Sequence, residues 1–413
     1  MKQLIIYSAA VCLFLGACEV KKVDEVSPAD ATDRNNAIAT NSTGLLLKDA
    51  NPDVIVGAAI NSYKFGNSSY LNLVKQQYNS VTAENDMKIA SLHPSETTWD
   101  FGNPNNSTEE KNEKIPNLAK NFGAKRIHGH TLVWHKSLPD WIKNIETNTP
   151  VGQRAARLDT IMKRHIFKTV AFYSNNYKAG NPLLPLLKSW DVVNEAFYNS
   201  GTLRGTKNMV DGDDTGSIWK RYMDEIYIEK AFRYARQAAR ANQNWKLKLF
   251  YNDYGHEFSP AKLTAICNMV NALKLKKEGP DPIINGVGLQ MHINVGTDPA
   301  AIRNAITKVK ETGLLVHIAE LDISLFLDKE TSIPAGKLAE RKNAQKKLYG
   351  DIAKWYQEIV PVKQRWGITL WNVGDSDSSQ PTAHEPTLYD VNYFRKANFY
   401  YFRDSLALKL NNR

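Results

Sequence analysis

Polar side chains that could do chemistry recur at the same place in eight short apolar segments of this 413-residue sequence. Each segment begins with aliphatic or β-branched residues and ends in Asn, Asp, Glu, Gln or His. A buried strand has no structural reason to end in this way, because an unpaired buried polar group costs about 1–3 kcal/mol. We therefore expect one shared site for Asn61, Glu84, Asn85, His130, Asn194, Glu195, Asn252, Asp253, Gln290, His292, Glu320 and Asn372.

Two of these residues are isolated glutamates, Glu195 in WDVVNEAF and Glu320 in HIAELDIS. Two carboxyl groups that face each other across a cleft can divide the work, because one can stay protonated as an acid while the other, ionised, attacks or activates water. Glycoside hydrolysis needs this pair. A separation of about 5–5.5 Å gives retention of configuration and about 6.5–9.5 Å gives inversion, and the sequence does not supply the distance.

The elements that must position these residues follow a regular alternation. Amphipathic stretches with helical spacing, such as 227–241, 260–277 and 298–313, separate the apolar segments. Eight strands, each followed by a helix, predict an α/β fold, a (β/α)8 TIM barrel in a single catalytic domain, whose strand ends build the active site on one face. The predicted strands are 54–61, 80–85, 126–134, 189–196, 248–255, 286–293, 314–323 and 367–373.

Composition narrows the possible functions. The chain has 42% apolar and 23% charged residues, as an ordinary folded protein does. Of three cysteines only Cys267 lies in the body. One thiol excludes an intrachain disulfide, a thiolate zinc site and an iron–sulfur cluster there, and we expect Cys267 to be an inert core residue on the apolar side of a helix. The formal net charge is +10, but the lysines are scattered, which indicates a solvated surface and no nucleic-acid partner.

The N-terminal segment predicts export and a lipid anchor. Residues 1–17 carry one lysine and an apolar run too short to remain as a membrane span, which is typical of a secretory signal. Leu15-Gly16-Ala17-Cys18 resembles the bacterial lipoprotein processing box, with Cys18 lipidated; a plain signal peptide is the alternative. Residues 18–48 would form a flexible tether and 49–413 the catalytic domain. The early charged residues weakly resemble export signals of Bacteroidetes lipoproteins, which implies anchoring to the outer membrane of the cell envelope, on the periplasmic or the outer face.

The motifs together resemble glycoside hydrolase family 10, the endo-β-1,4-xylanases, over about residues 49–407. The resemblance implies a monomeric retaining endo-β-1,4-xylanase that hydrolyses xylan or xylo-oligosaccharides by double displacement, with no cofactor and no metal. The motifs stand in order along the predicted strands at 78–88, 128–141, 190–197, 250–254, 286–293, 317–324 and 371–375.

The resemblance also implies roles for individual residues. Glu195 would be the acid/base and Glu320 the nucleophile. Asn194 would hydrogen-bond the 2-hydroxyl of the sugar being cleaved, and Gln290 and His292 would orient Glu320 and hold it ionised.

Seven further residues would bind substrate: Glu84, Asn85, Lys88, His130, Trp134, Tyr254 and Trp371. The lysine and the histidine would bind hydroxyls of the sugar being cleaved, and the glutamate and asparagine would bind the next sugar on the glycone side. The two tryptophans would form an apolar floor for the pyranose ring, and the tyrosine would lie over the cleavage point.

Three departures from the family pattern bear on substrate. Asn372 stands where a glycine is usual, Ser379 stands where a second tryptophan is expected, and residues 197–218 match no family motif. A serine at 379 opens space beside the catalytic centre unless Tyr389, Tyr393 or Phe394 fills it. A decorated or mixed-linkage xylan, or another β-linked polymer, therefore stays open as the substrate.

Other functions compete with this one. A metal-dependent hydrolase of the same fold is suggested by His128 and His130, but that motif normally lies on the first strand and here lies on the third. A non-catalytic glycan-binding surface lipoprotein would usually lack one of the two carboxylates. Residues 211–216 copy the first half of a calcium loop, but position 12 is Tyr222 where a glutamate would be needed.

Overall fold

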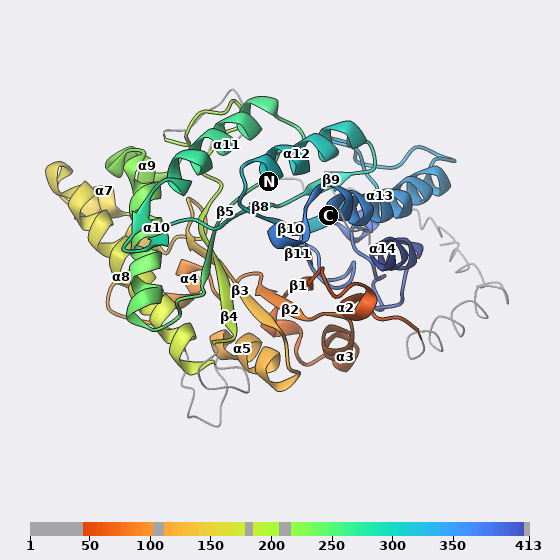
Figure 1. Cartoon of the computed structure of the whole chain (residues 1–413), viewed down its shortest axis with the longest axis horizontal. Helices are drawn as coiled ribbons and strands as arrows, with labels where there is room; N and C mark the ends of the chain where they lie inside the picture. Colours follow the sequence, from red (N-terminus) through yellow and green to blue (C-terminus); the bar gives the residue numbers. More distant parts are fainter. Residues whose placement is uncertain (1–43, 102–110, 178–184, 206–215, 409–413) are drawn as a thin grey trace, which may run out of the picture. The chain divides into compact units, whose positions relative to one another are not determined.

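Eight parallel strands form a closed barrel, as predicted (Figure 1). The computed structural model describes residues 44–101, 111–177, 185–205 and 216–408. The strand order is β11-β1-β2-β3-β4-β5-β8-β10, and pairing of β10 with β11 closes the ring, while the short β9 continues beside β10. The strands are β1 (Val56–Ile60), β2 (Ser80–Ala83), β3 (Arg126–Val133), β4 (Leu187–Asn194), β5 (Lys248–Asp253), β8 (Gly286–Leu289), β9 (His292–Asn294), β10 (Leu315–Ser324) and β11 (Arg365–Leu370).

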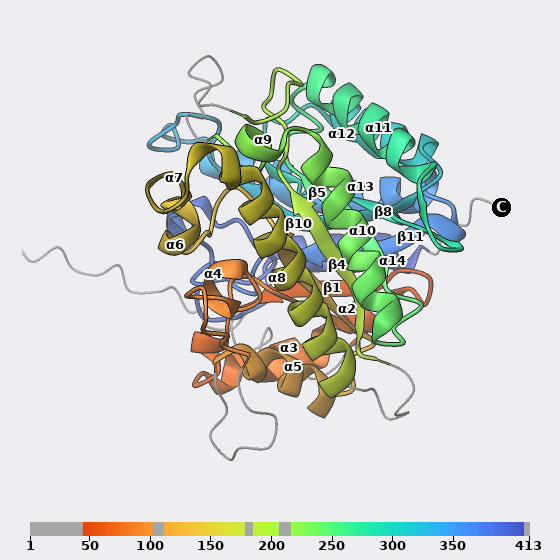
Figure 2. The ribbon, with the colours of Figure 1, turned by 90° about the vertical axis from the view of Figure 1, so that its left-hand side faces the viewer.

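Helices cover the outside of the barrel, and Figure 2 shows α8 and α10 side by side over β4. The longer helices are α3 (Ser68–Gln77), α5 (Lys111–Asn121), α8 (Arg154–Asn176), α10 (Ile226–Ala241), α11 (Pro260–Lys274), α12 (Pro299–Glu311), α13 (Leu338–Ile359) and α14 (Ala397–Ala407). Short helices are α2 (Leu47–Ala50), α4 (Ile89–Leu92), α6 (Asp140–Lys143), α7 (Ile145–Asn148) and α9 (Ile218–Met223), with 3-10 turns at Ser62–Lys64, Val151–Gln153, Val362–Gln364 and Thr382–His384. No helix in the described part of the chain is both long enough and apolar enough to cross a membrane.

Two helices illustrate how the sequence sets their ends. At α12 the Asp298 side chain accepts the backbone N–H of Ala300 at 2.9 Å and Pro299 occupies the first turn, as the Asp-Pro pair predicts. The predicted helix over 260–277 is too long, because α11 stops at Lys274. The next residues form a hairpin, in which β6 (Lys277–Glu278) pairs with β7 (Asp281–Pro282).

Three further predictions concern the start of the folded body, the calcium-loop pattern and Cys267. Leu47, at the start of α2, is fully buried, so the packed body begins slightly before the predicted boundary at 49. The predicted signal peptide and Cys18 lie outside the described residues, as do residues 211–215 of the calcium-loop pattern. Cys267 on α11 is only half-buried and packs against the core, so the expected core position is wrong. Burial still raises the pKa of its thiol to about 11, which fits an inert residue.

One glutamate that follows β5 is buried without a hydrogen-bond partner for its carboxyl group in the described part of the chain. Glu257 follows β5, is 6% exposed, and neither of its carboxyl oxygens has a hydrogen-bond partner in the described structure. Burial raises the pKa of this carboxyl from 4.5 to about 7. The fold therefore loses stability as the pH rises through this interval, because the unfolded chain ionises Glu257 more readily.

We predict that Glu257→Gln stabilises the protein above neutral pH and has little effect at pH 4. A pKa difference of this size corresponds to about 3 kcal/mol in the free energy of unfolding at pH 8, since the neutral amide avoids the buried charge. Urea unfolding at the two pH values measures the effect. Glu225→Gln at an exposed position is the control and should change stability by less than about 0.5 kcal/mol. An equal change for Glu257→Gln at both pH values would contradict the prediction.

Candidate active site

Seven of the twelve polar strand-end residues line one cavity of about 360 Å³, whereas Asn61, Asn85, Asn252, Asp253 and Asn372 do not. All the predicted catalytic and substrate-binding residues line it except Asn85, which lies just behind it and donates its Nδ2 to Asn61 Oδ1 at 3.3 Å. The lining residues are Glu84, Lys88, His130, Trp134, Lys136, Asn194, Glu195, Tyr254, Phe258, Gln290, His292, Glu320, Trp371 and Ser379.

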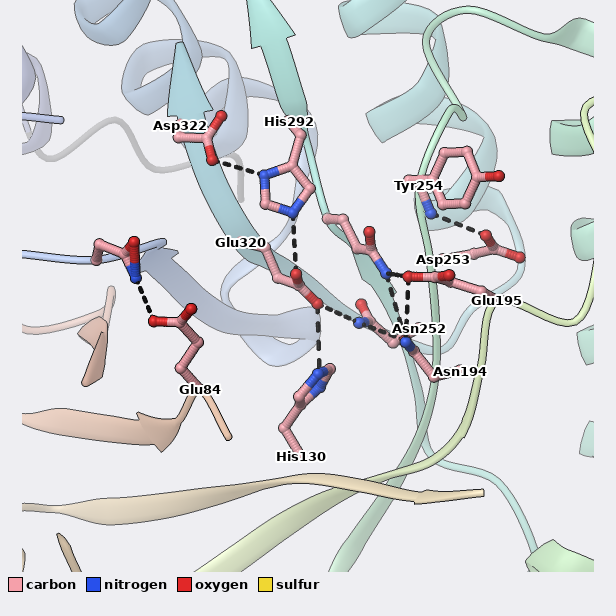
Figure 3. A network of polar contacts seen from close by, with 12 residues as sticks. Glu84, His130, Asn194, Glu195, Asn252, Asp253, Tyr254, His292, Glu320 and Asp322 are labelled. Atoms are coloured by element: carbon pink, nitrogen blue, oxygen red, sulfur yellow. Dashed lines mark hydrogen bonds and ion pairs between the residues drawn. The ribbon is translucent and has the colours of Figure 1, made fainter. Parts of the chain in front are cut away.

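Glu195 follows the last residue of β4 and is held by three donors; Figure 3 shows its contact with Asn194. Its Oε2 accepts the indole N–H of Trp134 at 2.9 Å. Its Oε1 accepts Gln290 Nε2 at 3.1 Å and lies 3.3 Å from Asn194 Nδ2. The expectation that Gln290 orients Glu320 is therefore wrong: this amide orients Glu195, because it also donates to Asn194 Oδ1 at 3.3 Å and so faces the β4 side of the cavity.

The surroundings of Glu195 have opposing effects on its charge. Burial raises the pKa of this carboxyl, but positive charge at His135 and Lys136 and the hydrogen bonds from Gln290 and Trp134 together lower it below its ordinary value. The Glu195 side chain of the protein without substrate is therefore ionised at neutral pH.

Glu320 lies in β10 and has a separate set of partners. Its Oε1 accepts Asn252 Nδ2 at 2.6 Å, and its Oε2 lies 3.0 Å from His292 Nε2. The other ring nitrogen of His292 lies 2.7 Å from Asp322 Oδ2. Burial lowers the pKa of His292, but Asp322 and Glu320 outweigh burial and raise that pKa well above its usual range. The imidazolium form thus donates to both carboxylates, which confirms the predicted contact between His292 and Glu320.

Asn252 connects the two catalytic candidates. Its Nδ2 donates to Glu320 Oε1 and also to Asn194 Oδ1 at 2.9 Å, and Asn194 in turn reaches Glu195 (Figure 3). The strand-end pattern of the sequence included Asn252, but no role was assigned to it. The two glutamates therefore belong to one hydrogen-bonded network.

On the β2 side of the cavity, Glu84 is held between two carboxamides. Asn61 Nδ2 and Asn372 Nδ2 both donate to Glu84 Oε2, the latter at 2.6 Å. Burial raises the pKa of Glu84. Nearby, Lys88 Nζ donates to Asn85 Oδ1 at 3.1 Å.

The unusual Asn372 fits the place of a glycine. Its φ is 76°, in the left-handed region that glycine enters freely and asparagine tolerates better than other residues. The substitution thus keeps the backbone path and adds the amide that binds Glu84. The sequence marks Asn372 only as a departure from the family pattern and does not predict its contact with Glu84.

Ser379 leaves the cavity open on its side. It is exposed and lines the cavity, whereas neither Tyr389 nor Tyr393 is among the lining residues. Tyr393 donates its hydroxyl to Asp377 Oδ1 at 2.7 Å, and the Tyr389 ring packs 5.5 Å from the Phe399 ring. These tyrosines are therefore committed elsewhere and do not fill the place of the missing tryptophan.

The His-x-His pair of β3 serves a carboxylate of the neighbouring strand. Asp191 on β4 lies 3.0 Å from His128 Nε2 through one oxygen and 3.0 Å from His130 Nδ1 through the other. Burial raises the pKa of Asp191, but the two histidines outweigh it and lower that pKa. No group of three or more His, Cys, Asp or Glu side chains among the described residues could hold a metal ion. The pair is thus accounted for by structure, and Asp191 is a further residue that the sequence did not single out.

Arg204 lies in the segment 197–218, which matches no family motif, and it binds the backbone of the site. It is fully buried, donates Nε to the Glu195 carbonyl at 3.2 Å and Nη2 to the Tyr254 hydroxyl at 3.1 Å. Its presence in a stretch without a recognisable pattern explains why it was missed. A buried arginine directly holds the turn that presents Glu195.

Comparison with known sequences agrees with this geometry. Residues 46–405 match the model of glycosyl hydrolase family 10. Similar curated proteins include exoglucanase XynX of Acetivibrio thermocellus (28% identity, 93% of this chain and 31% of the relative), endo-1,4-beta-xylanase A of Thermotoga maritima (31%, 92% and 32%) and endo-beta-1,4-xylanase Xyn10C of Cellvibrio japonicus (32%, 87% and 57%). The chain thus spans about a third to rather more than half of the length of these relatives.

Solved structures agree with the fold. Xylanase10C of Cellvibrio japonicus, a mutant in complex with xylopentaose, has a TM-score of 0.74 at 30% identity and covers 90% of this chain and 71% of its own. TsXylA of Thermoanaerobacterium saccharolyticum, a mutant in complex with xylotriose, has a TM-score of 0.72 at 25% identity and covers 88% of this chain and 99% of its own. With the family match over most of the sequence, the eight-stranded barrel and the paired glutamates at its strand ends, this chain belongs to glycosyl hydrolase family 10.

Proposed function

We propose that this chain is a retaining endo-β-1,4-xylanase in which Glu195 is the acid/base and Glu320 the nucleophile. The observation that carries the proposal is the placement of these two glutamates, from β4 and β10, in one cavity and one hydrogen-bonded network. Membership of a family with relatives named endo-1,4-beta-xylanase supports xylan as the substrate.

The reaction proceeds in two displacements. In the first, a Glu320 carboxylate oxygen bonds to the anomeric carbon while Glu195 gives its proton to the departing glycosidic oxygen. In the second, Glu195 takes a proton from water, whose oxygen replaces Glu320 at the same carbon, so the configuration is retained. His292 and Asn252 hold the two oxygens of Glu320 and fix the face from which it attacks.

Glu195 has to take up a proton when the substrate binds. Without substrate the neighbouring donors and positive charges hold the pKa of Glu195 below its ordinary value. A sugar that covers the cavity removes water from the carboxyl, and this desolvation raises the pKa toward the protonated form. The acid is thus prepared by binding.

The cavity walls suit a pyranose chain. Trp134 and Trp371 both line it, and the Trp371 ring lies 5.5 Å from that of His130 and 5.9 Å from that of His292, so its position beside the catalytic groups is fixed by edge contacts. Flat apolar faces bordered by Glu84 and Lys88 offer stacking and hydroxyl binding together. Other β-linked polymers remain the alternative, since one relative is named an exoglucanase.

We also propose that Cys18 carries a lipid anchor that places the enzyme at the cell envelope, as in Bacteroidetes-type lipoproteins. The support is the Leu15-Gly16-Ala17-Cys18 box after an apolar run.

The two glutamates should respond differently to substitution. Glu195→Ala is expected to lose about 10²- to 10⁴-fold in kcat/KM on xylan but far less on aryl glycosides with good leaving groups, which need little protonation. Added azide should restore turnover and yield a β-glycosyl azide.

Glu320→Gln serves as the matched variant and should lose activity on all substrates, and a 2-fluoro xylobioside should label wild type at Glu320, read by mass spectrometry. A label on another carboxylate would contradict the assignment of Glu320 as the nucleophile. Equal losses for Glu195→Ala on both substrate types, without an azide product, would contradict the assignment of Glu195 as the acid/base. Wild type that binds xylan without releasing reducing sugar would instead indicate a glycan-binding protein.

The lipid anchor is tested by fractionation. Full-length wild type is expected in the membrane fraction, and Cys18→Ser in the soluble or secreted fraction, because stable anchoring depends on the acyl chains at that residue. Cys267→Ser is the control and should fractionate as wild type. Fully soluble wild type would point to a plain signal peptide.

Ser379→Trp should shift the enzyme toward undecorated substrate. A tryptophan there adds a sugar-stacking contact of about 0.5–1.5 kcal/mol, or about 2- to 13-fold in binding, and closes the open side of the cavity. The ratio of kcat/KM on linear xylohexaose to kcat/KM on a heavily substituted xylan is therefore expected to rise severalfold. Ser379→Ala keeps the side open and should leave that ratio as in wild type; an unchanged ratio in Ser379→Trp would refute the prediction.

A further inference from the structure

A lysine side chain stands at the mouth of the active-site cavity. Lys136 follows Trp134 and His135 after the end of β3, is exposed, and lines the same cavity as Glu195 and Glu320. Its Nζ lies 5.9 Å from the centre of the Trp134 ring, whose indole N–H is bound to Glu195. The Trp134 side chain thus lies near the Lys136 ammonium group and also binds the Glu195 carboxyl group.

The other cations around the cavity already have partners. Lys88 Nζ donates to Asn85, and the fully buried Lys262 pairs with Asp253 at 2.7 Å beneath Tyr254. Lys136 differs, because no carboxylate in the described parts of the chain forms an ion pair with it. The acids of the cavity are committed to Trp134, Asn252 and the carboxamides around Glu84.

With a neutral sugar chain, Lys136 interacts electrostatically with Glu195 but has no ion-pair partner among the described residues. Pyranose hydroxyls supply weak dipoles, and a bound chain that covers Lys136 removes part of its hydration, which is unfavourable unless a counter-charge is provided. A carboxylate on the substrate provides it. Ser379, which is exposed, lines the same cavity and leaves one of its sides open.

We propose that Lys136 binds the carboxylate of a uronic-acid substituent on the xylan backbone, which makes acidic, glucuronate-bearing xylan the preferred substrate class. This inference rests on the proposed function and names the substrate of the same site.

The test separates charge from bulk. Glucuronoxylan and its carboxyl-reduced form carry substituents of nearly the same size, but only the first is charged. For wild type we expect kcat/KM to be about 2- to 5-fold higher on glucuronoxylan, the range of an accessible ion pair, and to fall toward equality with added salt. Lys136→Gln should bring the ratio of the two substrates close to 1, and Lys136→Arg should keep it.

Using the ratio removes a confounding effect. Lys136 also influences the charge of Glu195, so Lys136→Gln changes the reaction on both polymers, and this common change cancels. Lys363→Gln is the control, an exposed lysine next to the start of β11, at the opposite end of the barrel from the cavity, and it should leave the ratio and both rates as in wild type.

The outcomes distinguish the two proposals. A Lys136→Gln ratio equal to that of wild type, or a wild-type ratio of 1, overturns the role of Lys136 while leaving the xylanase assignment intact. Wild type that releases no reducing sugar from either polymer overturns the proposed function itself.

Discussion

The arrangement of the active site depends on the carboxamide of Asn252, which fits against the two neighbouring strands. Asn252 at the end of β5 pairs in register with Asn194 on β4 and with Gly288 on β8. A Cβ on Gly288 would lie 2.3 Å from Asn252 Oδ1, so only glycine there allows the side chain to turn inward. From that position its single NH₂ group reaches both Asn194 and Glu320, and through Asn194 it is connected to Glu195. The register of three parallel strands thus sets the relation between the two glutamates.

Much of this arrangement could be predicted from the sequence, because strand ends are marked by a change from apolar to polar residues and a barrel brings all of them to one face. The pattern cannot say which neighbour a side chain turns to. Gln290 shows the limit: it lies between β8 and β9, where Met291 has a φ of 66°, and this change of backbone direction gives its amide to Glu195 and not to Glu320. Arg204 was beyond sequence reasoning for another reason, since its partners are mainly backbone carbonyls, which no motif encodes.

Asn372 illustrates how a departure from a family pattern can be compatible with the fold. The backbone there needs a positive φ, which asparagine accepts at modest cost, and the side chain then supplies a donor to Glu84 that a glycine lacks. Because burial raises the pKa of Glu84, a hydrogen bond that favours its charged form has a direct use. The same position therefore accommodates the positive φ and places a donor on Glu84.

The charge of Glu195 connects catalysis with substrate choice. Lys136 is one of the groups that lower the pKa of this carboxyl, whereas the proposed first displacement needs Glu195 protonated. A substrate carboxylate bound to Lys136 offsets the positive charge, so the pKa of Glu195 rises as that substrate binds. A neutral xylan achieves the same direction of change only by excluding water from the cavity. An acidic substituent would thus promote the reaction through the protonation state of the acid as well as through affinity, and one lysine at the cavity mouth would serve both.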